Sequence, residues 1–258
     1  MTQSETYRKI LTRMRYYDYQ HGFLQRHITQ QGGWASHQER CRKTILDAIG
    51  IAEPRRVTVM GSGWILELPL AEMLEKTDEI VLVDIIHPPD VYRQTEGMKK
   101  VRLVEEDITG GLIEEVWRKA GRRSFLNRLC SLDDIIIPDY EPADDPGLVI
   151  SLNVLTQLEF LPLKLLRGKS TVREDEFDHF REEVQKSHLR FLMKHRSLLI
   201  TDTAEVYTGP RGNITEKKTA LVELPPGKIS DEWTWDFDLK HSDYNRKSTQ
   251  LRICALIF

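Results

Sequence analysis

The chain has 258 residues, of which 40% are hydrophobic, and its 37 basic and 40 acidic side chains leave a formal net charge of -3. This length and composition predict one main domain with a substantial core. The near-neutral charge gives no overall attraction to nucleic acid or to an anionic membrane, and no apolar stretch approaches the roughly 20 residues that cross a bilayer.

The cysteines and the first residues favour a reduced compartment. Cys41, Cys130 and Cys254 are odd in number and widely separated, which argues against a disulfide framework and against a zinc site. The first residues lack the basic-then-apolar pattern of a signal peptide. We therefore expect a cytoplasmic protein, and, because no His, Asp and Glu have metal-ligand spacing, no metal.

The predicted elements alternate along the chain. Residues 4–50 are expected to be mostly helical, with a break at 31–33 and a stop at Gly50. After Pro54 the pattern predicts strands at 57–60, 80–84, 101–104, 148–152 and 198–202, and helices at 64–76, 110–119 and 172–195, the last with a capping box at 171–174. The proline-rich segment 121–147 is expected to be a loop.

The C-terminal part differs, because the strand patterns 233–238 and 251–257 leave no room for a crossover helix and should pair antiparallel. The predicted fold is therefore α/β: a Rossmann-like three-layer α/β/α arrangement with a mostly parallel seven-stranded sheet and a C-terminal antiparallel hairpin. We expect residues 1–50 to form an N-terminal helical lid or extension and residues 51–258 to form the cofactor-binding domain.

Two glycines follow the first predicted strand, and an acidic residue ends the second. Gly61 and Gly63 permit a tight turn that lets backbone approach a ligand at a helix N-terminus. Asp84 lies 23 positions beyond Gly61, where a carboxylate can accept two hydrogen bonds from a ribose diol. The spacing predicts a nucleotide-cofactor site, although the turn alone also fits a structural strand-to-helix connection, and Asp84 alone fits a solvated strand end.

The strand–helix units, the glycine turn, the acid after the second strand and the terminal hairpin together resemble the class I S-adenosylmethionine-dependent methyltransferases, over roughly residues 40–258. In that family the turn commonly reads acidic-x-Gly-x-Gly-x-Gly, whereas here Val59 replaces the acid and Ile65 the third glycine. Glu67, expected one turn into the helix, is a partial substitute for that acid. The resemblance implies S-adenosylmethionine as the cofactor.

The resemblance also implies roles for single residues. Asp84 would hold the ribose hydroxyls, Asp107 would accept from the adenine amino group, and Ile108 would pack on the ring; Asp107 also fits a cap for the helix that follows. Asn153 falls where the family lines the cleft between cofactor and substrate. The cofactor-binding set is Gly61, Ser62, Gly63, Asp84, Ile85, Asp107, Ile108 and Asn153.

The methyl acceptor is less legible, because in-line transfer from a sulfonium mainly requires alignment and exclusion of water. Candidate catalytic residues are His37, Asn153 and His188, and candidate substrate contacts are Tyr19, Trp34 and His37. A surface role for His37, a core role for His188 and simple packing of Trp34 remain open alternatives. Asn153 is not followed by the Pro-Pro-aromatic sequence that marks amino methylation of nucleic-acid bases, which disfavours a nucleic-acid partner.

The leading hypothesis is a methyltransferase that acts on a small molecule, or on a protein side chain. The alternative from another class is a non-catalytic or regulatory module that binds an adenosyl cofactor, which the loss of the acid at position 59 favours. A third alternative is an aminopropyl transferase, which is disfavoured because the catalytic acidic pair of that class, expected after the fourth strand, is missing in this chain. A nicotinamide dehydrogenase would need a third glycine where Leu66 stands.

Overall fold

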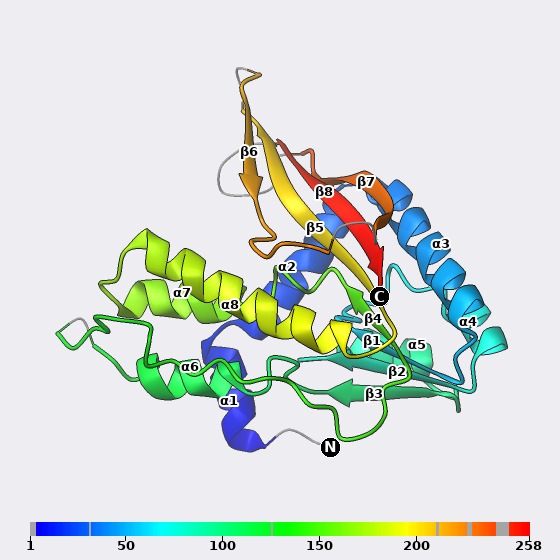
Figure 1. The fold of residues 1–258 in the computed structure, drawn as a ribbon, viewed down its shortest axis with the longest axis horizontal. Helices are drawn as coiled ribbons and strands as arrows, with labels where there is room; N and C mark the ends of the chain where they lie inside the picture. The colour runs from blue at the N-terminus through cyan, green and yellow to red at the C-terminus, as the bar shows by residue number, and fades with distance from the viewer. Residues whose placement is uncertain (1–3, 31, 125, 210–211, 226–228, 241–247) are drawn as a thin grey trace.

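The computed structural model describes the chain except residues 1–3, 31, 125, 210–211, 226–228 and 241–247. Gln31, one of the three residues of the predicted helix break, and the first three residues of the predicted N-terminal lid lie outside the described part. The described residues form a mixed sheet of eight strands with helices on both faces (Figure 1).

The helices are α1 (Glu5–Arg13), α2 (Tyr16–Thr29), α3 (Ala35–Ala52), α4 (Leu70–Lys76), α5 (Pro89–Thr95), α6 (Leu112–Ala120), α7 (Phe160–Lys169) and α8 (Glu174–Met193). The strands are β1 (Arg56–Met60), β2 (Glu79–Asp84), β3 (Val101–Glu105), β4 (Leu148–Leu152), β5 (Ser197–Thr208), β6 (Ile214–Lys218), β7 (Ile229–Asp238) and β8 (Ser248–Ile257).

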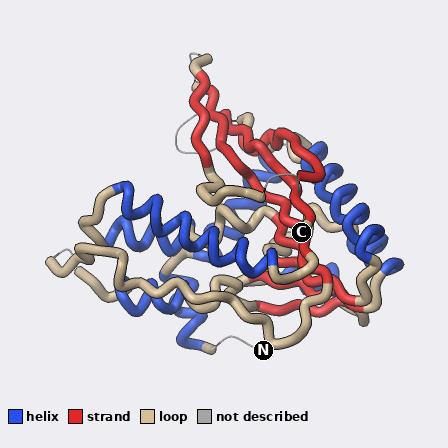
Figure 2. The backbone as a smooth tube through the Cα atoms, in the orientation of Figure 1, coloured by secondary structure: helices blue, strands red, loops and turns tan. Residues whose placement is uncertain are grey.

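The sheet runs in the order β3-β2-β1-β4-β5-β8-β7, and β6 pairs with the outer half of β5. Strands β1 to β5 are parallel to their neighbours in that order, whereas β8 is antiparallel to both β5 and β7. The Rossmann-like prediction with a terminal antiparallel hairpin is therefore confirmed. The eighth strand, β6, adds an antiparallel edge (Figure 2).

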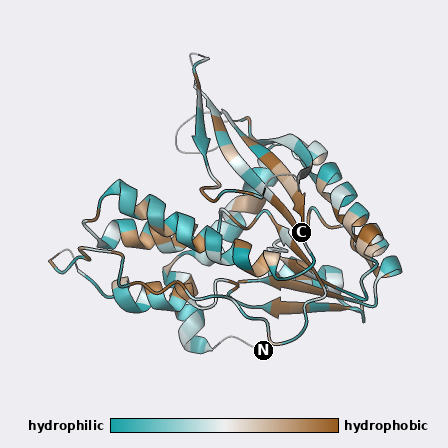
Figure 3. Cartoon of the chain, viewed as in Figure 1, coloured by the Kyte–Doolittle hydropathy of each residue, from teal (hydrophilic) through white to brown (hydrophobic). Residues whose placement is uncertain are grey.

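Side chains alternate between two cores, one on each face of the sheet. Along β2, Ile80 and Leu82 join the cluster under α3 and α4, while Val81 and Val83 join the cluster under α6, α7 and α8. A strand buried on both faces has a largely apolar sequence, and β1, β2 and β4 accordingly carry mostly hydrophobic residues, whereas β3 at the edge of the sheet has no buried residue (Figure 3). The three-layer arrangement follows from this double burial.

The N-terminal helical region has a second break besides the one predicted at residues 31–33. Arg15, between α1 and α2, has a left-handed backbone with φ 68°. The predicted stop at Gly50 is wrong, because α3 continues to Ala52 and Glu53 takes the left-handed end position with φ 42°. Pro54 then prevents further helix.

The predicted helix 64–76 begins only at Leu70. Gly63 and Ile65 both have positive φ, and Pro69 stands at the N-cap, so residues 64–69 form turns instead of helix. The predicted placement of Glu67 one turn into a helix is therefore wrong: Glu67 lies in the loop before α4. The capping box of α8 is shifted too, because the backbone N–H of Arg173 donates to Glu176 Oε1 at 3.4 Å.

Three elements were not predicted: α5, α7 and β6. α7 contains Pro162 and Gly168, and β6 is exposed along its whole length, so neither has a clear apolar period. The described part of the 121–147 segment is a loop, as expected. Leu129, Leu132 and Ile135 bury this loop against the core below α8.

Gly61 is the glycine on which the sheet most depends, and its replacement by alanine tests this. With φ +79°, a Cβ there would lie 2.7 Å from Leu152 O and 2.9 Å from Val154 Cβ. We expect Gly61→Ala to lower the free energy of unfolding by at least about 2 kcal/mol, measured by urea denaturation. Gly50→Ala in α3, where a Cβ meets nothing within 4 Å, is the control and should raise stability by up to about 1 kcal/mol. Equal effects of both changes would contradict this view.

Candidate functional site

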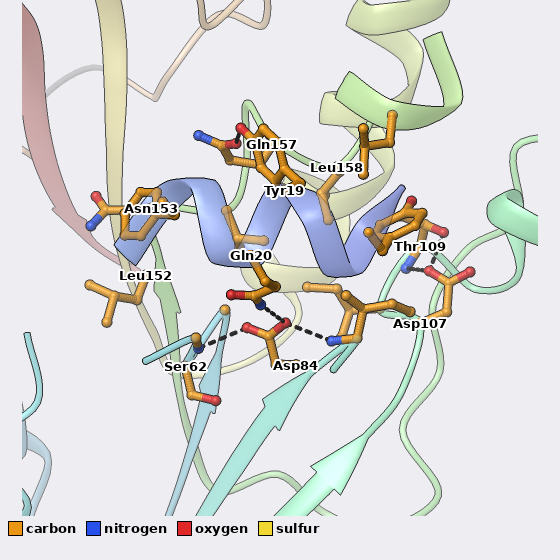
Figure 4. A pocket seen from close by; sticks show the side chains of 18 of the residues that line it. Tyr19, Gln20, Ser62, Asp84, Asp107, Thr109, Leu152, Asn153, Gln157 and Leu158 are labelled. Carbon is orange, nitrogen blue, oxygen red and sulfur yellow. Dashed lines mark hydrogen bonds between the residues drawn. The ribbon is translucent and has the colours of Figure 1, made fainter. Parts of the chain in front are cut away.

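A cavity lies at the carboxyl ends of β1, β2, β3 and β4, beneath α2 (Figure 4). It contains all of the residues that the sequence assigned to the cofactor: Gly61, Ser62, Gly63, Asp84, Ile85, Asp107, Ile108 and Asn153. Parallel strands bring their carboxyl ends to one edge of the sheet, so residues up to 92 positions apart become neighbours. Tyr19, a predicted substrate contact, also lines this cavity.

The glycine turn, residues 61–63, forms the floor of the cavity. Gly61 donates its N–H to Val83 O at 2.9 Å, which ties the turn to the end of β2. Gly63 has φ +47°, and a Cβ there would have no atom closer than 3.9 Å. The first glycine is thus required by close packing, whereas the second is required by its backbone conformation.

Ile65 occupies the place of the family's third glycine and still has φ 54°. A β-branched residue in the left-handed region is strained by about 1–2 kcal/mol. Ile65 is 8% exposed and packs in the core below α3, so burial offsets that strain. The turn therefore keeps its glycine-like geometry without the third glycine.

Asp84 links the glycine turn to the helix above it. Its Oδ2 accepts from Gly63 N at 2.8 Å, and its Oδ1 accepts from Ile85 N at 2.8 Å and from Gln20 Nε2 at 3.2 Å (Figure 4). Burial raises the pKa of Asp84 to about 6, against these hydrogen bonds, which lower it. The carboxylate is ionised at neutral pH and faces the cavity.

Gln20 is a site residue that the sequence analysis missed, because a single glutamine on a helix carries no pattern. It comes from α2, which crosses the cavity above the strand ends (Figure 4). Trp64 Nε1 donates to Gln20 O at 3.0 Å, and Tyr19 donates to Gln157 Oε1. α2 has no fully buried residue, so these polar contacts tie much of it to the cavity rim.

Asp107 is engaged by the backbone that follows it. Its Oδ1 accepts from Thr109 N at 2.9 Å and from the Thr109 hydroxyl, and its Oδ2 lies 3.4 Å from Ile113 N. Burial raises the pKa of Asp107. Asp107 is not the N-cap of the helix that follows, because α6 begins only at Leu112 with Gly111 at the N-cap, although Asp107 Oδ2 reaches Ile113 N in its first turn. The two carboxylate oxygens retain further lone pairs for a ligand.

Three of the predicted catalytic or substrate residues lie behind the cavity lining. Trp34 is fully buried, donates to Phe237 O at 3.0 Å and stacks on the Phe237 ring. His188 is 3% exposed and lies 2.9 Å from Ser151 Oγ, and burial lowers its pKa to about 4. His37 is 1% exposed and touches Asn153. The aromatic side chains of β7 hold Trp34 and His37 in the core, because Trp34 packs on Trp235 and Phe237 and His37 packs on Trp233 and Trp235.

Ser62 and Glu67 line the cavity wall near the glycine turn. Ser62 Oγ lies 3.0 Å from His87 Nε2, and burial lowers the His87 pKa to about 4. Glu67 is 6% exposed, its Oε1 has no hydrogen-bond partner among the described residues, and burial raises its pKa to about 7. A buried carboxylate oxygen without a partner at the wall of a cavity is suited to a cationic group of a ligand.

Among the residues that the structure describes, no group of three or more His, Cys, Asp or Glu is arranged to hold a metal ion. No described helix combines the length and the apolar character needed to cross a bilayer.

No protein-family model matches the chain, and no curated protein does. Several solved structures are similar in fold. The 1,6-didemethyltoxoflavin-N1-methyltransferase of Burkholderia thailandensis, solved with 1,6-didemethyltoxoflavin and S-adenosylhomocysteine, is 11% identical, with 100% of this chain and 91% of that chain covered and a TM-score of 0.47. The N-methyltransferase NodS of Bradyrhizobium japonicum, in complex with S-adenosylhomocysteine, is 7% identical, with 84% and 86% covered and a TM-score of 0.32.

The methyltransferase domain of a bacterial Hen1 protein is 12% identical, with 85% and 99% covered and a TM-score of 0.35. Scores below 0.5 at such identities carry no argument about reaction or substrate. The strand order and the terminal hairpin themselves confirm the Rossmann-like fold that the resemblance to class I methyltransferases implied.

The raised pKa of Asp84 predicts how stability depends on pH. Its folded pKa of about 6 lies above the ordinary value of 3.8, so the folded state holds its proton more tightly and stability falls as pH rises through this interval. We expect the Asp84→Asn variant to show a shallower fall between about pH 4 and pH 7, by up to about 3 kcal/mol for a shift of this size. Urea denaturation at several pH values measures it; an unchanged slope would contradict the assignment.

Proposed function

We propose that the chain binds S-adenosylmethionine in this cavity and transfers its methyl group to a small-molecule acceptor. The observation that carries the proposal is the position of Asp84. Its carboxylate lies at the end of β2, accepts a hydrogen bond from the N–H of Gly63 and faces the cavity between Asp107 and the glycine turn. An acid in that place is suited to a ribose diol.

The order of the strands supports an extended cofactor. Asp107 follows β3, Asp84 ends β2, the glycine turn follows β1 and Asn153 follows β4, and these strands are consecutive neighbours in the sheet. Neighbouring strands lie about 4.8 Å apart, so the four positions span roughly 14 Å. In our proposal adenine lies at Asp107 and Ile108, ribose at Asp84, and the sulfonium and amino-acid end near the glycine turn.

Gln20 has a specific part in this proposal. It donates to Asp84 Oδ1 at 3.2 Å, and in our proposal a ribose hydroxyl takes this place on the carboxylate. Binding therefore requires the Gln20 amide to withdraw or to turn toward another oxygen of the ligand. Because Gln20 lies on α2, replacement of its hydrogen bond to Asp84 by one from the ribose couples entry of the cofactor to movement of this helix.

The lid is proposed to consist of α1 and α2, the larger part of the 1–50 extension. Arg15 and Gly32, both with positive φ, stand at the two ends of α2. α3 instead packs on the sheet and on β7, so it belongs to the covering layer around the 51–258 domain. Tyr19, with its ring 5.0 Å from that of Phe160, is the proposed acceptor contact on this lid.

Methyl transfer in this cavity needs alignment more than acid–base chemistry. When bound, the cofactor would supply the electrophilic methyl group. An electron pair of the acceptor, in line with the carbon–sulfur bond, would form the new bond to the methyl carbon while the carbon–sulfur bond breaks and its electron pair stays on the sulfur of S-adenosylhomocysteine. Side chains of this chain orient both partners and keep water out. His37 and His188 lie behind the cavity lining, and burial lowers their pKa values to about 3 and about 4, so both are weak bases out of reach of an acceptor in the cavity.

Charge and cysteine state support the remaining assignments. The net charge of -3 gives no overall attraction to nucleic acid. All three cysteines are free, and two of them are buried. We retain the cytoplasm as the proposed location and a small molecule as the proposed acceptor.

Calorimetry with S-adenosylhomocysteine tests the cofactor site. Asp84→Ala removes the carboxylate and should weaken binding at least about tenfold, because charged hydrogen bonds to a ligand contribute about 1.5–3 kcal/mol. Asp78→Ala is the matched control, since Asp78 precedes the same strand at its other end and pairs with exposed Arg55. Absence of binding by the wild type, or equal affinities of both variants, would refute the proposal. Binding without transfer to any acceptor would favour the non-catalytic alternative.

The buried Glu67 predicts a pH-dependent affinity. We propose that its carboxylate binds the ammonium group of the cofactor, in place of the acid missing at Val59. Its pKa of about 7 means that it is largely protonated at pH 6 and ionised at pH 8. Affinity for S-adenosylhomocysteine should therefore rise about tenfold between these values, whereas Glu67→Gln should flatten the profile. An unchanged profile in the variant would exclude Glu67 from this contact.

A further inference from the structure

A line of hydrogen bonds runs from β7 through α3 to the cavity. Trp233 Nε1 lies 3.0 Å from His37 Nδ1, and His37 Nε2 lies 3.1 Å from the side-chain amide of Asn153. His37 is stacked on Trp235 with the ring centroids 3.8 Å apart, which fixes the plane of the imidazole. Because each member has few ways to donate or accept, the direction of the whole line can be deduced.

The direction starts at the indole. An indole nitrogen is a donor only, so His37 Nδ1 must accept from Trp233 and carries no proton. Burial lowers the pKa of His37 to about 3, and the ring is therefore neutral at physiological pH. The single ring proton consequently sits on Nε2.

The proton on His37 Nε2 decides which way the Asn153 amide faces. The oxygen and nitrogen of an amide are distinguished by their hydrogen bonds. The structure places the Asn153 Nδ2 group 3.1 Å from His37 Nε2, which would set two donors against each other. Exchanging the two ends of the amide puts Oδ1 in that place, where it accepts from Nε2–H. Cys41 Sγ, at 3.5 Å from Nε2, is only a weak acceptor and does not alter this choice. The NH₂ group of Asn153 is thereby turned to the other end of the amide.

That other end of the amide, where the structure places Oδ1 and the exchange puts the NH₂ group, is buried and has no hydrogen-bond partner among the described residues. Asn153 itself has a left-handed backbone with φ 51° and lines the cavity. A buried donor without a partner destabilises a protein by about 1–3 kcal/mol. Such a group is expected at a place where a ligand atom with a lone pair completes the hydrogen bond.

Glu67 belongs to the same corner of the cavity. Burial and, after it, the charge of Glu67 raise the pKa of the Cys41 thiol, and Cys41 touches His37. Both Glu67 and Asn153 line the cavity, and each has a buried polar atom without a partner. One presents an anion and the other a donor, which together complement a zwitterion.

We infer that Asn153 is a locked hydrogen-bond donor that binds the carboxylate of the cofactor's amino-acid end, with His37 and Trp233 as positioning residues. This inference rests on the proposed function for the identity of the ligand. It assigns opposite signs to two neighbouring contacts: Glu67 binds the ammonium group and Asn153 binds the carboxylate. The site therefore selects adenosyl compounds that carry an intact amino acid.

The tautomer of His37 can be measured without any ligand. Long-range ¹H–¹⁵N correlation spectra, assigned by comparison with a His37→Ala variant, should show a neutral ring protonated on Nε2. Trp233→Phe removes the only donor deduced for Nδ1 and should shift the ring toward a mixture of tautomers. A proton on Nδ1 in the wild type, or an imidazolium at neutral pH, would overturn the locked donor.

The carboxylate contact is tested with two nucleosides that differ in the amino-acid part. S-adenosylhomocysteine carries it and 5′-methylthioadenosine lacks it. Asn153→Asp keeps an oxygen for His37 but replaces the NH₂ group by a second acceptor. Calorimetry should show S-adenosylhomocysteine bound at least about tenfold more weakly, equal to 1.4 kcal/mol, with the affinity for 5′-methylthioadenosine changed less than about twofold.

A second variant separates the contact from folding. Glycine accepts a φ of 51° without strain, so Asn153→Gly should remain folded in a thermal unfolding assay and show the same selective loss. Trp233→Phe should lower the affinity for S-adenosylhomocysteine about threefold, because His37 then no longer holds the Asn153 amide in a single orientation.

The outcomes distinguish this inference from the proposed function. If the wild type binds neither nucleoside, the proposed function fails, and the carboxylate contact fails with it. If the wild type binds both, but the Asn153 variants weaken both equally or neither, the proposed function stands and the carboxylate contact is wrong. Selective loss of S-adenosylhomocysteine alone supports the contact.

Discussion

The close approach of β1 and β4 at Gly61 is the constraint on which the cavity depends. In the order β3-β2-β1-β4-β5, the strands β2 and β3 lie on one side of β1, and the strands β4 and β5 lie on the other side. The connections that leave β1 and β4 therefore diverge at this point of the sheet. Gly61 lets the backbone of one strand end pass against Leu152 and Val154 of the other. Any side chain at this position would push the strands apart and displace the turn that holds Asp84.

A second constraint joins the two ends of the sequence. Trp34 packs edge-on against Trp235 and face-on against Phe237, and Gln30 donates to buried Asp238 at 2.9 Å. These contacts anchor the start of α3 to β7, about 200 positions later in the chain. They fix one end of α2, so that this helix lies over the cavity while its own side chains remain partly exposed.

Three carboxyl groups, whose ionised forms are poorly solvated, lie together around the cavity. Burial raises the pKa of Asp84, Asp107 and Glu67, which means that the folded protein holds carboxyl groups where their ionised forms are poorly solvated. A core built only for stability would fill these places with apolar side chains. Their grouping around one cavity supports a binding role, because a ligand can supply the hydrogen bonds and charges that the protein leaves unmatched.

Local patterns in the sequence were sufficient to predict the strands β1 to β5 and the closing hairpin, and the eight residues proposed for the cofactor all line one cavity. Apolar runs define buried strands by themselves, and parallel strands place their carboxyl ends at one edge, so glycines and acids after those strands had to meet. The helix α5 escaped prediction because seven residues are too short to show a helical period, and α7 because Pro162 and Gly168 interrupt its period. Tertiary structure alone decided the position of Gln20, the loop geometry of Glu67 and the burial of Trp34 and His37. These depend on contacts between residues far apart in the chain, and a hydrogen bond such as that from Gln20 to Asp84 has no local pattern that could announce it.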